Sequence, residues 1–118
     1  MAEDKIIVLR GIKKFSMNTW MGAHWGTKAS LKRKIQDLVY KQKLPNEIFK
    51  CEVKYDFYFD ITGHKKLFDC TNCAAMIKNI EDALFSDDAP LHVKKVTITS
   101  QENVTRKADD VVITIKYL

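Results

Sequence analysis

The sequence predicts an α+β protein of one domain, in which two helices cover a mixed β-sheet. Three observations support this prediction. The 118 residues suffice for one hydrophobic core. A composition of 46% hydrophobic and 30% charged residues is typical of a folded globular protein. Segments with strand and helix periodicity follow one another in the order β-α-β-α-β-β, and no repeat or Pro/Gly-rich linker divides residues 1–118.

The first half of the chain predicts one strand, one loop and one helix. Residues 6–9 form a short apolar run that indicates a buried strand. Residues 11–26 contain three glycines and follow neither period, which favours a loop. Thr27 or Ser30 is expected to cap a helix that ends near residue 42. Its apolar positions form one stripe, Leu31, Ile35, Leu38 and Val39.

The second half predicts a strand, a helix and two further strands. Residues 49–59 alternate clearly between apolar and polar side chains. Helical spacing then runs from about residue 69 to residue 85. Residues 93–99 and 111–117 alternate again, and the polar segment 101–110 between them favours a long hairpin. In the strand predicted over residues 49–59, the side chains of one face are expected to be buried: Cys51, Val53, Tyr55, Phe57 and Phe59.

Composition narrows the class of protein and its surroundings. No apolar stretch is long enough to span a membrane, and the N-terminal residues do not resemble a signal peptide, so a cytoplasmic protein is expected. The net charge is +5 and is uneven. Residues 1–54 carry twelve Lys and Arg against five Asp and Glu, whereas residues 55–118 carry eight against ten. This asymmetry favours a polyanionic partner together with an acidic site, although solubilising charge is the alternative.

Acidic residues mark both ends of the second predicted helix. Asp69 and Asn72 lie three positions apart at its start, and Asp87 and Asp88 follow its end. Carboxylate and amide oxygens are the ligands that Mg²⁺ prefers. The ends of a helix this long lie about 22 Å apart, so one site forms only if the chain turns back along the helix. The alternative is a structural one, in which Asp69 is a helix cap and the Asp pair belongs to a turn.

Three cysteines are too few for a secreted disulfide scaffold. Cys70 and Cys73 form a Cys-x-x-Cys pair, for which only Cys51, His64 and His92 offer additional zinc ligands. A redox pair at a helix start is another alternative. The simplest interpretation is that both are small, partly buried residues.

Aromatic and basic residues are mixed in residues 16–34. Aromatic rings can stack on unpaired bases, and cations neutralise phosphates. Trp20 and Trp25 have an alternative role, which is to anchor a loop on the core. The basic residues that lie off the apolar stripe are Lys28, Lys32, Arg33 and Lys34.

Taken together, these segments resemble the RusA family of Holliday-junction resolvases, small endonucleases common in phages and prophages. The similarity is centred on residues 68–90, FDCTNCAAMIKNIEDALFSDDAP, which look like the family's Asp-x-Asp-Asn or Asp-x-x-Asn pattern, its lysine-bearing helix and its paired aspartates. Residues 94–98 and 109–115 look like its closing strands, and Ser16 and Asn18 look like its Ser-x-Asn motif.

The resemblance implies a homodimer that binds branched DNA and cuts it by symmetric nicking in DNA recombination and repair. By this similarity Asp69, Asp87, Asp88 and Asn72 would hold Mg²⁺ or Mn²⁺, and Lys78 would be the catalytic lysine beside Asp69 and Asp88. The four basic residues above would bind backbone phosphates.

Two departures from the family pattern lead to an alternative. Thr71 stands where the family's Asp-x-Asp pattern has its second aspartate, and the connection between Leu84 and Asp87 is shorter than in many relatives. The alternative is therefore a catalytically weak or inactive RusA-like module that binds DNA or another protein.

Overall fold

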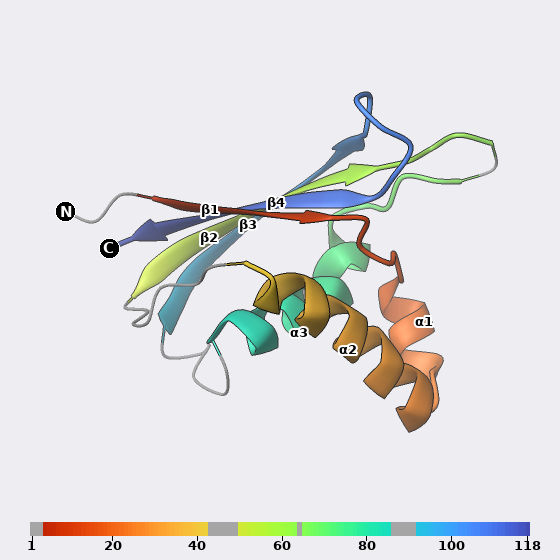
Figure 1. Cartoon of the computed structure of the whole chain (residues 1–118), viewed down its shortest axis with the longest axis horizontal. Coiled ribbons are helices and arrows are strands. Elements are labelled where there is room, and N and C mark those ends of the chain that lie inside the picture. Colours follow the sequence, from red (N-terminus) through yellow and green to blue (C-terminus); the bar gives the residue numbers. More distant parts are fainter. Residues whose placement is uncertain (1–3, 43–49, 64, 86–91) are drawn as a thin grey trace.

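The computed structural model describes residues 4–42, 50–63, 65–85 and 92–118. It confirms the predicted class: one small compact α+β domain with a mixed sheet. Four strands form this sheet in the order β1-β4-β2-β3, and the helices gather on one of its faces (Figure 1). The strands are β1 (Lys5–Arg10), β2 (Cys51–Phe59), β3 (Val93–Glu102) and β4 (Asp110–Tyr117).

The sheet is mixed because it contains both antiparallel and parallel neighbouring strands. β4 lies between β1 and β2 and runs antiparallel to both. β3 runs parallel to β2, and the helix α3 (Ala74–Phe85) connects them. Parallel neighbours require such a crossover, because a short turn cannot return the chain to the same end of the sheet.

The expected hairpin between the last two strands is wrong, because β2 separates β3 from β4. The physical reason lies in the side chains. Val111, Ile113 and Ile115 of β4 are all 0% exposed, as suits a central strand. β3 carries Lys94 and Lys95 and fits an edge position, where one side of the strand meets water.

The predicted burial of the clearest strand is confirmed. All five inward residues of β2 are at most 1% exposed, and Tyr55, Phe57 and Phe59 stack in series along the strand. The helix α2 (Trp25–Tyr40) adds Leu31, Ile35 and Val39 to the same core, with Leu38 partly buried against it; the same four residues were predicted as its apolar stripe.

The segment predicted as a loop contains an additional helix, α1 (Met17–Gly22). Ser16 starts it: its hydroxyl oxygen accepts a 3.1 Å hydrogen bond from the N–H of Thr19. This capping interaction stabilises a short helix that apolar periodicity cannot reveal. The helix α2 also begins earlier than predicted, after His24 rather than at Thr27 or Ser30. Three helices and a 3₁₀ turn, η1 (Thr71–Cys73), are therefore found where two helices were expected.

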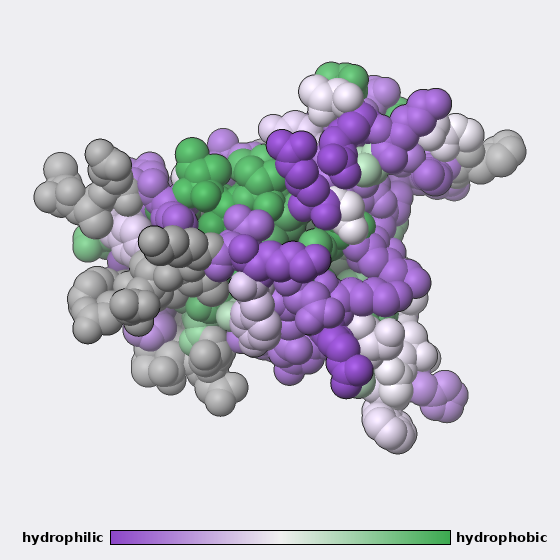
Figure 2. Space-filling view, viewed as in Figure 1, coloured by the Kyte–Doolittle hydropathy of each residue, from purple (hydrophilic) through white to green (hydrophobic). Residues whose placement is uncertain are grey.

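In the view of Figure 2, the apolar and the hydrophilic parts of the surface lie over different elements of the fold. Apolar side chains show over the sheet, and hydrophilic side chains dominate over α2. In β1, the side chain of Ile6 is 62% exposed. No helix in the described part of the chain is long and apolar enough to cross a membrane.

Candidate metal and nucleic-acid site

Asp69 is the best defined of the predicted site residues. Its Oδ1 accepts 2.9 Å hydrogen bonds from the N–H of Asn72 and from the hydroxyl of Thr71. These two bonds lower the pKa of Asp69, with the backbone bond as the larger cause. Asp69 therefore caps the turn η1, as the structural alternative expected. Oδ2 accepts no hydrogen bond from any described residue, so one exposed oxygen remains available to a cation.

Thr71 is the residue that stands in place of the second aspartate of the RusA pattern. Its hydroxyl is directed to Asp69, so it offers that carboxylate a hydrogen-bond donor rather than a second negative charge. Asn72 is half-buried, and among the described residues its side-chain amide has no hydrogen-bond partner. The Asp69 turn, defined here as residues 69–72, thus presents one carboxylate oxygen and one amide as hard ligands, which fits Mg²⁺ only in part.

The remaining predicted acidic ligands, Asp87 and Asp88, lie outside the described residues. Within the described ranges, no three His, Cys, Asp or Glu side chains are close enough to hold a metal ion together. The expected meeting of Asp69 with Asp88 therefore stays a prediction.

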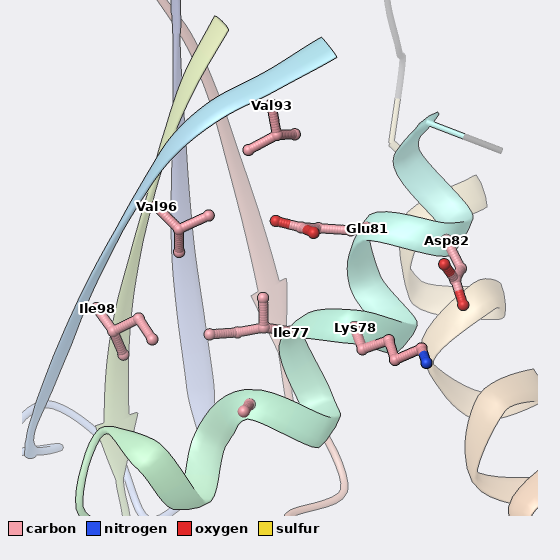
Figure 3. A pocket seen from close by; sticks show the side chains of 8 residues that line it. Ile77, Lys78, Glu81, Asp82, Val93, Val96 and Ile98 are labelled. Atoms are coloured by element: carbon pink, nitrogen blue, oxygen red, sulfur yellow. The ribbon is translucent and has the colours of Figure 1, made fainter. Parts of the chain in front are cut away.

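Lys78 forms no hydrogen bond or ion pair with the Asp69 turn among the described residues. It lies nine positions further along the chain, about 13 Å of helix axis if each position adds a helical rise. It lines an open groove of about 510 Å³ between α3 and β3, and its amine points away from β3 (Figure 3). In the described part of the chain it forms no ion pair, although Asp82 stands one turn further along the same helix.

A lysine that sequence reasoning missed, Lys14, lies over the ring of Phe68, the residue that precedes the Asp69 turn. Its ammonium group lies 4.4 Å from the ring centroid of Phe68 and 5.2 Å from that of Phe59. It also donates a hydrogen bond to the carbonyl of Lys66. Cation–π contacts of this kind hold the charge in place at the surface. No local pattern could have revealed Lys14, because the residues that hold it lie some fifty positions away.

The predicted basic residues all belong to α2, but they differ in their surroundings. Arg33 and Lys34 are exposed, and Lys32 is half-buried. Lys28 is also half-buried, with its amine 5.5 Å from the ring centroid of Trp20. This contact places the amine of Lys28 against the ring of Trp20 on α1, and its binding of phosphate stays a prediction.

A second missed lysine extends the basic surface beyond α2. The positive charge of Lys13, in the loop after β1, is the largest cause that lowers the pKa of Lys34. Two cations held close together repel one another, and an anion between them relieves that repulsion. We call Lys13, Lys32, Arg33 and Lys34 the basic surface.

The two tryptophans have different roles. Trp20 is partly buried and stacks on Phe15 at 5.6 Å, which confirms the anchoring interpretation for it. Trp25 is 84% exposed at the start of α2, so the anchoring interpretation is wrong for this residue. An exposed indole is a suitable surface for stacking on an unpaired base.

The three cysteines are free thiols, and among the described residues no three His, Cys, Asp or Glu side chains gather where they could hold a metal ion. The thiol of Cys70 lies 3.5 Å from the carbonyl oxygen of Ile98, and that of Cys73 lies 3.5 Å from the carbonyl oxygen of Asp69. Burial raises the pKa of Cys73 to about 12, opposite to what a reactive thiol needs. The interpretation as small, partly buried residues is the one that the geometry supports.

Glu81 is a further group that the sequence did not single out. It is half-buried on α3, and its carboxylate points into the groove toward β3 (Figure 3). The hydroxyl of Tyr55 donates a 2.9 Å hydrogen bond to its Oε1. Burial raises the pKa of Glu81, and the bond from Tyr55 offsets part of that rise.

Comparison with known proteins adds no assignment. No protein-family model matches the chain, and no curated protein matches its sequence significantly. The resemblance to the RusA family therefore rests on the motif residues alone.

Proposed function

We propose that the protein is a structure-selective endodeoxyribonuclease that depends on Mg²⁺ or Mn²⁺. It resolves Holliday junctions and other branched DNA by symmetric nicking, in the manner of the RusA family, and acts as a homodimer in the cytoplasm. The observation that supports this proposal is the neighbourhood of the Asp69 turn. A carboxylate with a free oxygen follows directly after Phe68, the ring over which Lys14 is held.

The roles of the residues follow from their chemistry. Asp69 and Asn72 would hold the cation together with Asp87 and Asp88. A cation held there would activate a water molecule and stabilise charge on the scissile phosphate. Lys14 places a fixed positive charge near that phosphate, and Lys78 would do so if the DNA extends along α3. The basic surface binds backbone phosphates, which positions the DNA without reading its sequence.

The decisive test is a cleavage assay with a labelled four-way junction, beside duplex and single-stranded controls, in Mg²⁺, Mn²⁺ or EDTA. Asp69→Asn is the informative variant, because asparagine caps helices about as well as aspartate and so preserves the fold. Asp37→Asn, an exposed residue of α2, is the matched control. Paired nicks that need the metal and disappear only in Asp69→Asn are expected. Equal cutting by all three proteins would overturn the assignment of Asp69.

A second candidate function is favoured by the bond between Thr71 and Asp69. Because the Thr71 hydroxyl adds no charge and engages Asp69, we also propose the alternative of a catalytically weak or inactive module that binds DNA or a protein. Binding of the junction without cutting in either metal ion would support this function. Thr71→Asp then supplies a second carboxylate, and cleavage by this variant alone would identify Thr71 as the cause of weak activity.

A further inference from the structure

The groove between α3 and β3 has mostly apolar walls. α3 contributes Ile77 to one wall, and β3 contributes Val96 and Ile98 to the other (Figure 3). Val96 pairs with Val53 and Ile98 pairs with Tyr55, so both side chains lie on the face of the sheet that the helices cover. Val96 is nevertheless 41% exposed, because the groove is open there. The volume of about 510 Å³ is in the range of sites that bind small organic molecules.

The carboxylate of Glu81 is directed into this groove. In Figure 3 it reaches from α3 toward β3, between Val93 and Val96. Two other charged residues of α3, Lys78 and Asp82, line the groove as well, but their side chains point away from β3. A molecule in the groove would therefore meet apolar side chains and one carboxylate.

Tyr55 holds this carboxylate in place from within the core. Its hydroxyl donates a 2.9 Å hydrogen bond to Oε1 of Glu81, and its own side chain is 0% exposed. Among the described residues no other hydrogen bond and no ion pair reaches the Glu81 side chain, so Oε2 has no partner there. Burial raises the pKa of Glu81, because it removes water from a charge that no described cation balances. A cation bound beside Glu81 would offset that cost.

The apolar walls and the carboxylate together select the chemistry of a ligand. Apolar walls favour an apolar body, and the carboxylate favours a cation that donates a hydrogen bond to it. The same carboxylate repels phosphates and organic acids, which separates the groove from the basic surface. An organic amine whose ammonium group adjoins an apolar body combines both required properties.

We propose that the groove between α3 and β3 is a binding site for a small apolar amine. The ammonium group of the ligand donates a hydrogen bond to Oε2 of Glu81. Its apolar body lies between Ile77 on one side and Val96 and Ile98 on the other. The site shares no residue with the Asp69 turn, so the proposal does not depend on whether the protein cuts DNA.

The first test compares three probes of nearly one shape and different charge: 4-phenylbutylamine, 4-phenylbutanol and 4-phenylbutanoate. Each is titrated into the full chain at pH 7 without DNA, and NMR follows the isoleucine and valine methyl groups. The amine is expected to shift the signals of Ile77, Val96 and Ile98, with a dissociation constant on the order of 1 mM for a probe of this size. The alcohol should bind about tenfold more weakly, and the acid more weakly still. No shift of these signals by the amine, or equal affinity for the amine and the alcohol, would overturn the proposal.

The second test locates the ammonium group. Glu81→Gln keeps an acceptor for the hydroxyl of Tyr55 and removes the charge. Its affinity for the amine should fall about tenfold, while its affinity for the alcohol stays the same. Asp82→Asn removes a charge from the next residue of α3, which points away from β3, and is the matched control. Undiminished amine binding by Glu81→Gln, or an equal loss in Asp82→Asn, would overturn the role of Glu81.

Discussion

The hydroxyl of Thr71 donates a 2.9 Å hydrogen bond to Oδ1 of Asp69. The same oxygen accepts the N–H of Asn72, so the carboxylate is oriented by its own turn while Oδ2 stays unbonded within the described structure. This arrangement makes Asp69 both a cap and a candidate ligand. The two roles are compatible, because each uses a different oxygen.

Removing the Thr71 hydroxyl is expected to raise the pKa of Asp69 toward its ordinary 3.8 without abolishing the shift. Thr71→Val deletes one donor, whereas the backbone bond from Asn72 remains. The free energy of unfolding should change little, because the site is exposed and water can replace the lost donor. NMR titration of the Asp69 carboxyl measures the pKa. Thr105→Val removes a comparable hydroxyl bond in the loop after β3 and should leave Asp69 unchanged.

Neutralising the basic surface is expected to weaken DNA binding and to reduce its salt dependence. The positive charges of Lys13 and Lys34 repel one another in the free protein, and Lys13→Gln and Lys34→Gln each remove one of the two charges. Each should lower the slope of log affinity against log salt by about one if it contacts a phosphate. Fluorescence anisotropy with a labelled four-way junction at several salt concentrations measures this slope. Lys54→Gln is the control. Lys54 and Asp56 lie on the face of the sheet opposite to the helices, with the Nζ of Lys54 3.7 Å from the Oδ1 of Asp56. An equal loss in the control would exclude a localised surface.

The ionised side chain of Glu81 is expected to lower the free energy of unfolding at neutral pH. Its folded pKa is raised above the ordinary 4.5, so folding becomes less favourable as pH rises from that value through the folded pKa. Glu81→Gln keeps an acceptor for the Tyr55 hydroxyl and removes the charge. The variant should therefore unfold at a higher temperature than the wild type at pH 7, with no advantage below about pH 4.

Circular dichroism melts at a series of pH values test this difference. Asp37→Asn, an exposed carboxyl of α2, corrects for the change in net charge. A pH-independent gain in the melting temperature of Glu81→Gln would show that the charge of Glu81 is not its cause.

The three thiols are expected to react at very different rates in the native protein. Cys51 and Cys73 are both 0% exposed, and burial raises the pKa of each. Cys70 is partly exposed. An aromatic disulfide reagent at pH 8 should therefore modify one thiol quickly and all three only after unfolding. Cys70→Ser should remove the fast reaction. Fast modification of two thiols in the native protein would contradict the burial of Cys73.

The sequence by itself determined the class of the fold and most of its buried residues. Alternation in residues 51–59 and the apolar stripe of α2 depend only on local periodicity, and each element keeps its pattern wherever it packs. The short helix α1 was missed because one capping side chain, Ser16, stabilises it, and six residues are too few to show a period.

Only the tertiary structure decided the order of the strands, the residues that lie near Asp69, and the groove between α3 and β3 into which Glu81 points. The placement of β2 between β3 and β4 depends on which strand is apolar enough for the centre of the sheet. Lys14 reaches the ring of Phe68, and Tyr55 reaches Glu81, across long separations along the chain. Such contacts arise when the core closes and depend on the geometry of packing, which no local pattern of residues encodes.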